Sequence, residues 1–215
     1  VRSMRGRDIA VGPRGTTIDI SQTATNVPEA GTGVGCGSAG NTADNSWWRR
    51  FYFDEHAGVG STAQINTVTI GSEEGPIIPV TVNVYTIASS AAVDTIDTAQ
   101  LTLIGTGTGT VGGSLALSTV AITGGLVDDT VGKDLVVEYN VQPATTGRLF
   151  PASTSSAETH PTFISSTACA ITTPTTAAAI GFPEFHLVMV VNVGAGGPPT
   201  GCAAPVCPSN SNSGV

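Results

Sequence analysis

Aromatic and basic side chains gather in one short stretch of the chain, and their types could bind a ligand. The stretch holds five of the eleven aromatic residues and two arginines: Trp47, Trp48, Arg49, Arg50, Phe51, Tyr52 and Phe53. Flat rings beside polar donors suit contacts with sugars and with protein partners. We therefore take Trp47, Trp48 and Tyr52 as a candidate ligand platform. The alternative is structural, with one face of a strand in the core and the other face covered by a neighbouring strand.

Carboxylates occur in adjacent pairs that could ligate a cation. Asp128 and Asp129 form one such pair, and Asp134 follows shortly after them. Calcium binds oxygen-rich loops of this kind, although the ligand spacing of an EF-hand is absent. These three aspartates are therefore the candidate metal ligands, with calcium as the metal, and we expect no other cofactor. The alternative is that they are solvated turn charges.

The three histidines, His56, His160 and His186, show no catalytic pattern. A nucleophilic triad needs a serine or cysteine beside one of them, and the chain contains no Gly-x-Ser-x-Gly elbow. His186 alternates with apolar residues, which favours a structural role in a strand. His160 precedes Pro161 in a loop, with no signal for a base or a metal ligand. We therefore expect no enzymatic activity and no catalytic residues.

Four cysteines, Cys36, Cys169, Cys202 and Cys207, form an even set whose spacing does not fit a structural zinc site. Disulfides are favoured instead, and free buried thiols are the alternative. Of the three connectivities, we prefer Cys36 to Cys169 and Cys202 to Cys207, because the last two are close together in a Pro-rich tail.

The sequence also bears on where the protein acts. The longest apolar run, Phe185 to Val193, is too short for a transmembrane helix. The chain begins at Val1 with no apolar leader, which is typical of a mature product from which a leader has been removed. An internal fragment of a longer protein would look the same. Together with the cysteines, this predicts a protein outside the cell or at the cell surface.

The candidate ligand, metal and cysteine residues named above must be positioned by β-strands and their connections. Period-two alternation with β-branched residues predicts them at Thr16–Ser21, Gln64–Gly71, Pro79–Ala88, Gln100–Gly105, Ser114–Thr123, Asp134–Val141, Pro161–Ser165 and Phe185–Val193. Gly- and Pro-rich turns separate these runs, including 105–113. The one helix candidate is Val93 to Gln100, about two turns and capped by Asp94. The pattern predicts an all-β, antiparallel β-sandwich of jelly-roll or immunoglobulin-like type.

Positive charge is concentrated at the start of the chain. Residues 1–14 hold four of the eight cations and one carboxylate, a net charge of +3, which leaves -11 on the other 201 residues given the total of -8. Nucleic acid, whose phosphates require clustered cations, is not an expected partner of an acidic chain. We divide the chain into a basic N-terminal arm (1–20), a sandwich domain (21–193) and a Gly/Pro/Ser-rich tail (194–215).

Several segments resemble a β-sandwich module of large secreted bacterial proteins, among them proteases and surface proteins. They are Asn45–Arg49, Val80–Tyr85, Leu135–Glu138, Thr162–Ser166, Ala168–Ile171 and Ala179–Met189, so the similarity spans roughly residues 40–193. Most of these motifs are packing residues. The resemblance implies an accessory or surface role and brings no catalytic residues.

The preferred hypothesis is a non-catalytic extracellular structural subunit that assembles with copies of itself into a filament or surface layer. Its arm would add a strand to the sheet edge of an acidic neighbour. The arm residues for these contacts are Arg2, Arg5, Arg7, Ile9, Val11, Arg14, Ile18 and Ile20. Alternatively, the arm is the first strand of its own sandwich. A second hypothesis is an accessory module of a secreted hydrolase that binds polysaccharide or a cell-surface protein through Trp47 and Trp48.

Overall fold

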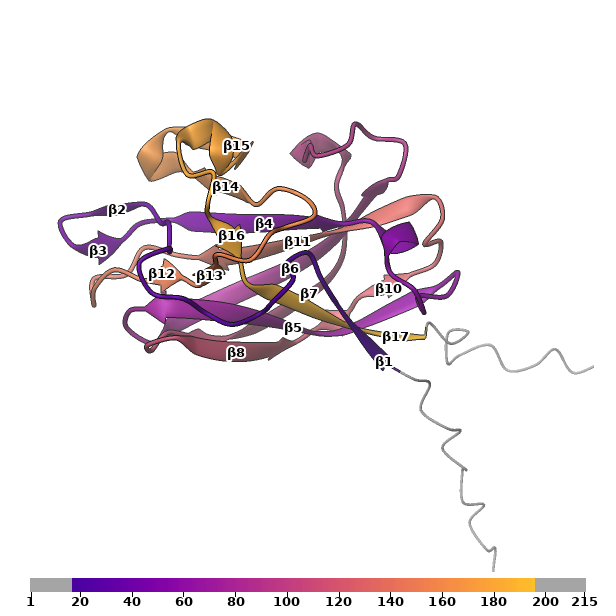
Figure 1. Ribbon diagram of the computed structural model, residues 1–215, viewed down its shortest axis with the longest axis horizontal. Helices are drawn as coiled ribbons and strands as arrows, with labels where there is room; N and C mark the ends of the chain where they lie inside the picture. The colour runs from indigo at the N-terminus through magenta and orange to yellow at the C-terminus, as the bar shows by residue number, and fades with distance from the viewer. Residues whose placement is uncertain (1–16, 196–215) are drawn as a thin grey trace, which may run out of the picture.

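Two antiparallel sheets packed face to face make up residues 17–195, the part of the chain that the computed structural model describes (Figure 1). The first sheet has the order β1 (Thr17–Ser21), β17 (Met189–Ala195), β5 (Ala63–Glu74) and β10 (Leu126–Val127), and β5 also pairs with β8 (Ala116–Ala121) and β12 (Phe150–Pro151). The second sheet has the order β15 (Ile171–Thr176), β14 (Phe163–Ser166), β4 (Asn45–Phe51), β11 (Lys133–Val141), β6 (Ile78–Ala88), β7 (Thr102–Val111) and β9 (Thr123–Gly124). The predicted all-β antiparallel sandwich is confirmed.

Short elements complete the described chain. Two small hairpins pair β2 (Gly37–Ser38) with β3 (Asn41–Thr42) and β13 (Ser153–Thr154) with β16 (His186–Leu187). Four short 3₁₀ helices connect strands: η1 (Phe53–Glu55), η2 (Thr98–Gln100), η3 (Thr167–Cys169) and η4 (Ala178–Ile180).

The core lies between the two sheets and follows the alternation of the sequence. In β6, Val80, Val82 and Val84 are buried, while the residues between them are only half-buried. In β4 all seven residues are buried, because its inner face packs in the main core and its outer face in a second cluster around Trp48. Each fully buried Val contributes roughly 1.5–3 kcal/mol to stability relative to an exposed one.

Two local predictions were wrong. The glycine-rich stretch 105–113 is mostly strand, since β7 continues to Val111, and a Cβ on Gly107 would lie 2.2 Å from the Ala121 carbonyl oxygen. The glycines therefore allow close approach of neighbouring backbone and do not form a turn. The two-turn helix is absent: the described chain has only η2 there, capped by Asp97, because Asp94 adopts a left-handed conformation with φ of 54°.

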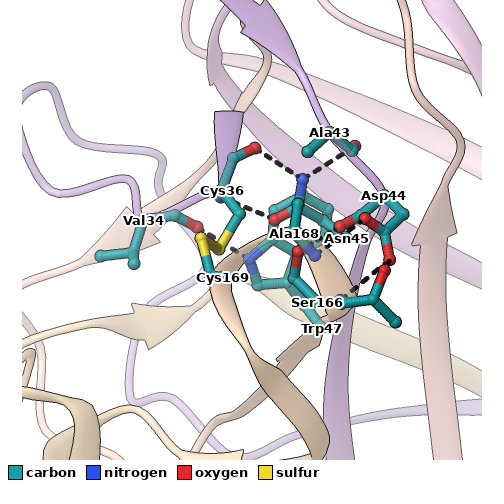
Figure 2. The surroundings of a disulfide bond; sticks show 10 residues. Val34, Cys36, Ala43, Asp44, Asn45, Trp47, Ser166, Ala168 and Cys169 are labelled. Atoms are coloured by element: carbon teal, nitrogen blue, oxygen red, sulfur yellow. Dashed lines mark hydrogen bonds between the residues drawn. A yellow bond between two sulfur atoms is a disulfide. The ribbon is translucent and has the colours of Figure 1, made fainter. Parts of the chain in front are cut away.

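A disulfide joins Cys36 to Cys169, as predicted, and crosslinks the segment before β2 to η3 at the end of β14 (Figure 2). The side chain of Asn45 accepts from the Cys36 amide at 2.7 Å and donates to its carbonyl oxygen at 2.9 Å. The Asp44 carboxylate accepts from the amide and hydroxyl of Thr167. Asn45, the first residue of β4, thus holds Cys36, and Asp44, which precedes it, holds the start of η3, the short helix that ends at Cys169. Cys202 and Cys207 lie outside the described residues.

Strand β1 belongs to the sheet of its own chain. It pairs antiparallel with β17, placing Ile18 opposite Val193 and Ile20 opposite Val191. Ile20 is buried in the core. These two arm residues are therefore placed in their own sheet and not on a neighbour. The remaining arm residues named above, Arg2 to Arg14, lie outside the described residues.

Candidate functional site

A cavity of about 620 Å³ opens where β4 passes into η1, a volume within the ~300–1,000 Å³ range of ligand pockets. We call it the acidic cavity. Its ionisable lining is Asp54, Glu55, Asp134 and His160, and its apolar lining is Phe53, Val59, Val93 and Val131. These residues come from η1, from β11 and from connections before β5, after β6, before β11 and before β14.

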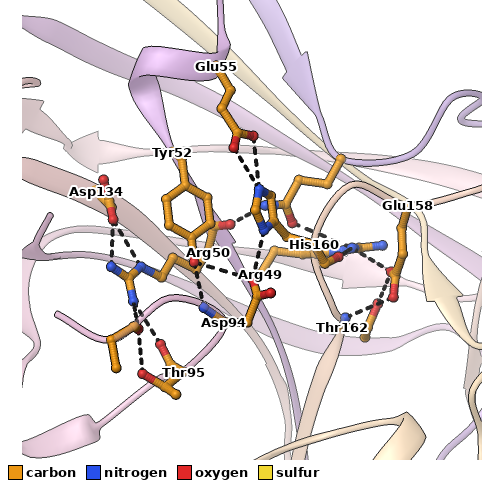
Figure 3. Close-up of polar contacts among 12 residues, drawn as sticks. Arg49, Arg50, Tyr52, Glu55, Asp94, Thr95, Asp134, Glu158, His160 and Thr162 are labelled. Atoms are coloured by element: carbon orange, nitrogen blue, oxygen red, sulfur yellow. Dashed lines mark hydrogen bonds and ion pairs between the residues drawn. The ribbon is translucent and has the colours of Figure 1, made fainter. Parts of the chain in front are cut away.

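Arg50, the first anchor of the cavity, points from β4 toward Asp134 on β11 (Figure 3). Its Nε and Nη2 both donate to the same carboxylate oxygen, at 3.0 and 2.7 Å. The guanidinium also donates to the carbonyl oxygens of Ala92 and Thr95. Arg50 is buried, so these bonds are shielded from water and fix the connection between β6 and η2.

Arg49, the second anchor, points to the opposite face of β4. Its Nη1 donates to the Glu158 carboxylate at 2.7 Å and to the His160 carbonyl oxygen at 2.9 Å, and its Nη2 donates to the Leu187 carbonyl oxygen at 2.7 Å. Adjacent residues of one strand thus hold two cavity walls, because successive strand side chains point to opposite faces.

His160 clamps two carboxylates at the cavity (Figure 3). Its Nδ1 lies 2.7 Å from Asp94 and its Nε2 lies 2.8 Å from Glu55. Both ring nitrogens can donate only in the imidazolium form. Burial alone lowers the pKa of His160, but the hydrogen bonds and charges of Glu55 and Asp94 outweigh burial and raise it. The Tyr52 ring packs against the imidazole with ring centroids 4.2 Å apart.

The acidic cavity carries an excess of negative charge. Burial is the largest cause that raises the pKa of Asp134; the hydrogen bond and charge of Arg50 lower it, and the charges of Asp54 and Glu55 raise it by smaller amounts. Asp54 and Glu55 thus repel the Asp134 carboxylate, although Arg50 attracts it more strongly. The arrangement suits a cationic group with an apolar stem, because valines line the same cavity.

The prediction that Trp47, Trp48 and Tyr52 form an exposed ligand platform is wrong, because all three side chains are buried. Trp47 is fully buried, with its ring centroid 4.8 Å from that of Tyr139, and its indole donates to the Val34 carbonyl oxygen. Trp48 is 6% exposed and donates to the Ser165 hydroxyl. Tyr52 is also buried and meets the acidic cavity only at its lining. Neither tryptophan ring is exposed for a ligand, because side chains cover both faces of β4.

The three candidate calcium ligands do not converge. Asp128 pairs with Lys133, Asp129 accepts from the amides of the turn that follows it, and Asp134 pairs with Arg50. In residues 17–195, no group of three His, Cys, Asp or Glu side chains is placed to hold a metal ion.

Sequence reasoning missed the role of His160. Its partners lie 66 and 105 residues away along the chain, and no local motif links them. The fold brings them together because β4, β6 and β14 belong to one sheet, and the segments beside these strands meet at the cavity. The prediction of a structural role for His186 is consistent with its place in β16, where Nδ1 lies 2.7 Å from the Ser156 carbonyl oxygen.

Comparison of the chain with protein-family models, with curated proteins and with solved structures finds no match. The resemblance to a module of secreted bacterial proteins therefore stays a prediction. No helix within residues 17–195 has the length and apolar character to cross a membrane.

The His160 clamp predicts a pH-dependent stability. Because the folded pKa is raised, the clamp contributes fully below the unfolded value of about 6.5 and is lost as pH rises through the folded value. The free energy of unfolding in urea should fall over that interval, and His160→Gln should remove the fall. Burial lowers the pKa of His56, so any effect of His56 on the free energy of unfolding is confined to pH values below about 6.5. An equal pH slope in both proteins above that value would contradict the clamp.

Proposed function

We propose that this chain is a non-catalytic extracellular structural subunit that assembles with copies of itself through its basic N-terminal segment. If each copy binds the segment of the next copy and the chain of contacts does not close into a ring, the copies form a filament or surface layer. The observation that carries this proposal is the separation of charge between the segment and the sandwich.

The described body is strongly acidic. Residues 17–195 contain fifteen carboxylates and four cations, a net charge of -11, whereas residues 1–14 carry +3. Three of the body cations, Arg49, Arg50 and Lys133, are engaged in ion pairs within the body. The fourth, Arg148, lies over the Phe150 ring. Opposite net charges favour encounter of the segment of one copy with the body of another.

An available sheet edge supports the same proposal. In the described part of the chain, β1 pairs with β17 and forms the end of the first sheet. An edge strand presents backbone donors and acceptors that can pair with another chain. The Cys36–Cys169 disulfide supports an extracellular site, since disulfides persist in oxidising compartments. Trp47 and Trp48 are buried, so these two rings do not support the glycan-binding alternative.

Deleting residues 1–14 should abolish assembly while leaving β1 and the sandwich intact. Negative-stain electron microscopy and sedimentation velocity of the full chain should show polymers that the truncated chain lacks. Removing residues 209–215 provides a control that shortens the other end and changes no charged side chain. Polymers of normal length from the truncated chain would refute the proposal, as would a full chain that stays monomeric at high concentration.

A further inference from the structure

The acidic cavity carries more negative than positive side chains, and one of its carboxylates, Asp54, forms no ion pair within residues 17–195. Four carboxylates, Asp54, Glu55, Asp94 and Asp134, line or border it, against Arg50 and His160. Burial is the main cause of the raised pKa of Asp134, and the nearby charges of Asp54 and Glu55 raise it by a smaller amount. An additional positive group would relieve this repulsion.

The lining favours an arginine side chain over a metal ion. No three ligating side chains of residues 17–195 converge as a metal requires. Two valines stand at the cavity with large exposed fractions, Val93 at 64% and Val131 at 81%. An arginine can lay its methylene stem along such apolar groups while its guanidinium forms charged hydrogen bonds with carboxylates.

The chain itself contains the matching group. We propose that the acidic cavity receives an arginine side chain from the N-terminal segment (residues 1–16) of a second copy of this protein. This inference rests on the proposed function and names the surface that captures the segment. The segment supplies four guanidinium groups, those of Arg2, Arg5, Arg7 and Arg14, whereas Arg49, Arg50 and Lys133 of the body are engaged in ion pairs within it.

The segment joins the sandwich at β1, close to the acidic cavity, and it is long enough to reach a second copy. Ile18 of β1 lies near Gly58, since a Cβ added there would be 3.6 Å from its methyl group, and the next residue, Val59, lines the acidic cavity. Arg2 precedes Thr17 by fifteen residues, a reach of at most about 50 Å when extended. This length allows contact with a neighbouring molecule. Arg14, three residues before Thr17, has a much shorter reach.

Two full-length variants test the transfer. The cavity variant, Asp54→Lys, keeps its segment but reverses one charge of the cavity. The segment variant replaces Arg2, Arg5, Arg7 and Arg14 with glutamine and keeps its cavity. Each variant alone should sediment as a monomer. An equal mixture should form heterodimers, because the cavity variant supplies an intact segment and the segment variant supplies an intact cavity. High ionic strength should dissociate these heterodimers, since salt screens the charges.

Matched controls separate the cavity from net charge. Glu184→Lys makes the same charge change at an exposed residue outside the cavity lining and should assemble as the unaltered chain does. If Asp54→Lys proves unfolded by circular dichroism, Asp54→Asn serves instead. A labelled peptide of residues 1–16 should then bind the segment variant about tenfold more tightly than a protein combining both sets of changes.

The outcomes distinguish this inference from the proposed function. Normal assembly of the cavity variant, or a mixture that stays monomeric, overturns the inference even if the full chain polymerises. An unaltered full chain that stays monomeric, because each segment fills its own cavity, would also overturn the inference. Segment-exchanged dimers of the full chain without polymers would support the inference and refute the filament.

Discussion

Replacing Arg49 with methionine is expected to lower the free energy of unfolding by about 3–5 kcal/mol. Arg49 is 1% exposed, and its guanidinium is the donor to Glu158 and to the carbonyl oxygens of His160 and Leu187. Burial lowers its pKa to about 10, opposed by Glu158, so the guanidinium is still charged near neutral pH. Methionine would leave the carboxylate and both carbonyl oxygens without this donor. Urea denaturation monitored by tryptophan fluorescence measures the loss.

A second substitution identifies the source of that loss. Adding Glu158→Gln to Arg49→Met removes the uncompensated negative charge, so the double variant should recover part of the lost stability. Glu158 also accepts from the Thr162 hydroxyl, and glutamine can keep that bond. A loss below about 1 kcal/mol for Arg49→Met would show that the buried ion pair contributes no more than an exposed one.

Removal of the Cys36–Cys169 disulfide is expected to cost about 5 kcal/mol in the chain-entropy model, because the bond closes a loop with a sequence separation of 133. The variant carrying Cys36→Ser and Cys169→Ser should unfold at lower urea concentration. Replacing Cys202 and Cys207 with serine makes the same chemical change outside the described residues and serves as the comparison. Equal midpoints for the first variant and the unaltered chain would contradict the expectation.

The sandwich could be predicted from the sequence because apolar and polar residues alternate along its strands, just as buried and exposed positions do. In β6 the valines face the core and Thr81, Asn83 and Tyr85 face away, as alternation requires. Glycines misled the prediction at Gly105 and Gly107, whose small size serves close packing of strands. Composition alone does not distinguish a glycine that turns the chain from one that lets another backbone approach.

The candidate site was harder to predict. Alternation correctly separated Trp47 from Trp48, yet it did not reveal that strands, loops and the second cluster would cover both rings. The acidic cavity depends on His160, Glu55 and Asp94, which only the finished fold brings into contact. Such a site forms from connections, and sequence periodicity carries little information about where connections meet.

The anchoring of the cavity walls by main-chain atoms has an implication for sequence divergence. Arg50 holds the connection after β6 through the carbonyl oxygens of Ala91, Ala92 and Thr95, which every amino acid provides. Apart from Asp94, which pairs with His160, the side chains in that connection can therefore change in evolution or by design while its path is conserved. The specificity of the cavity can be re-engineered without touching its supports, provided that Arg50 and Asp134 are retained.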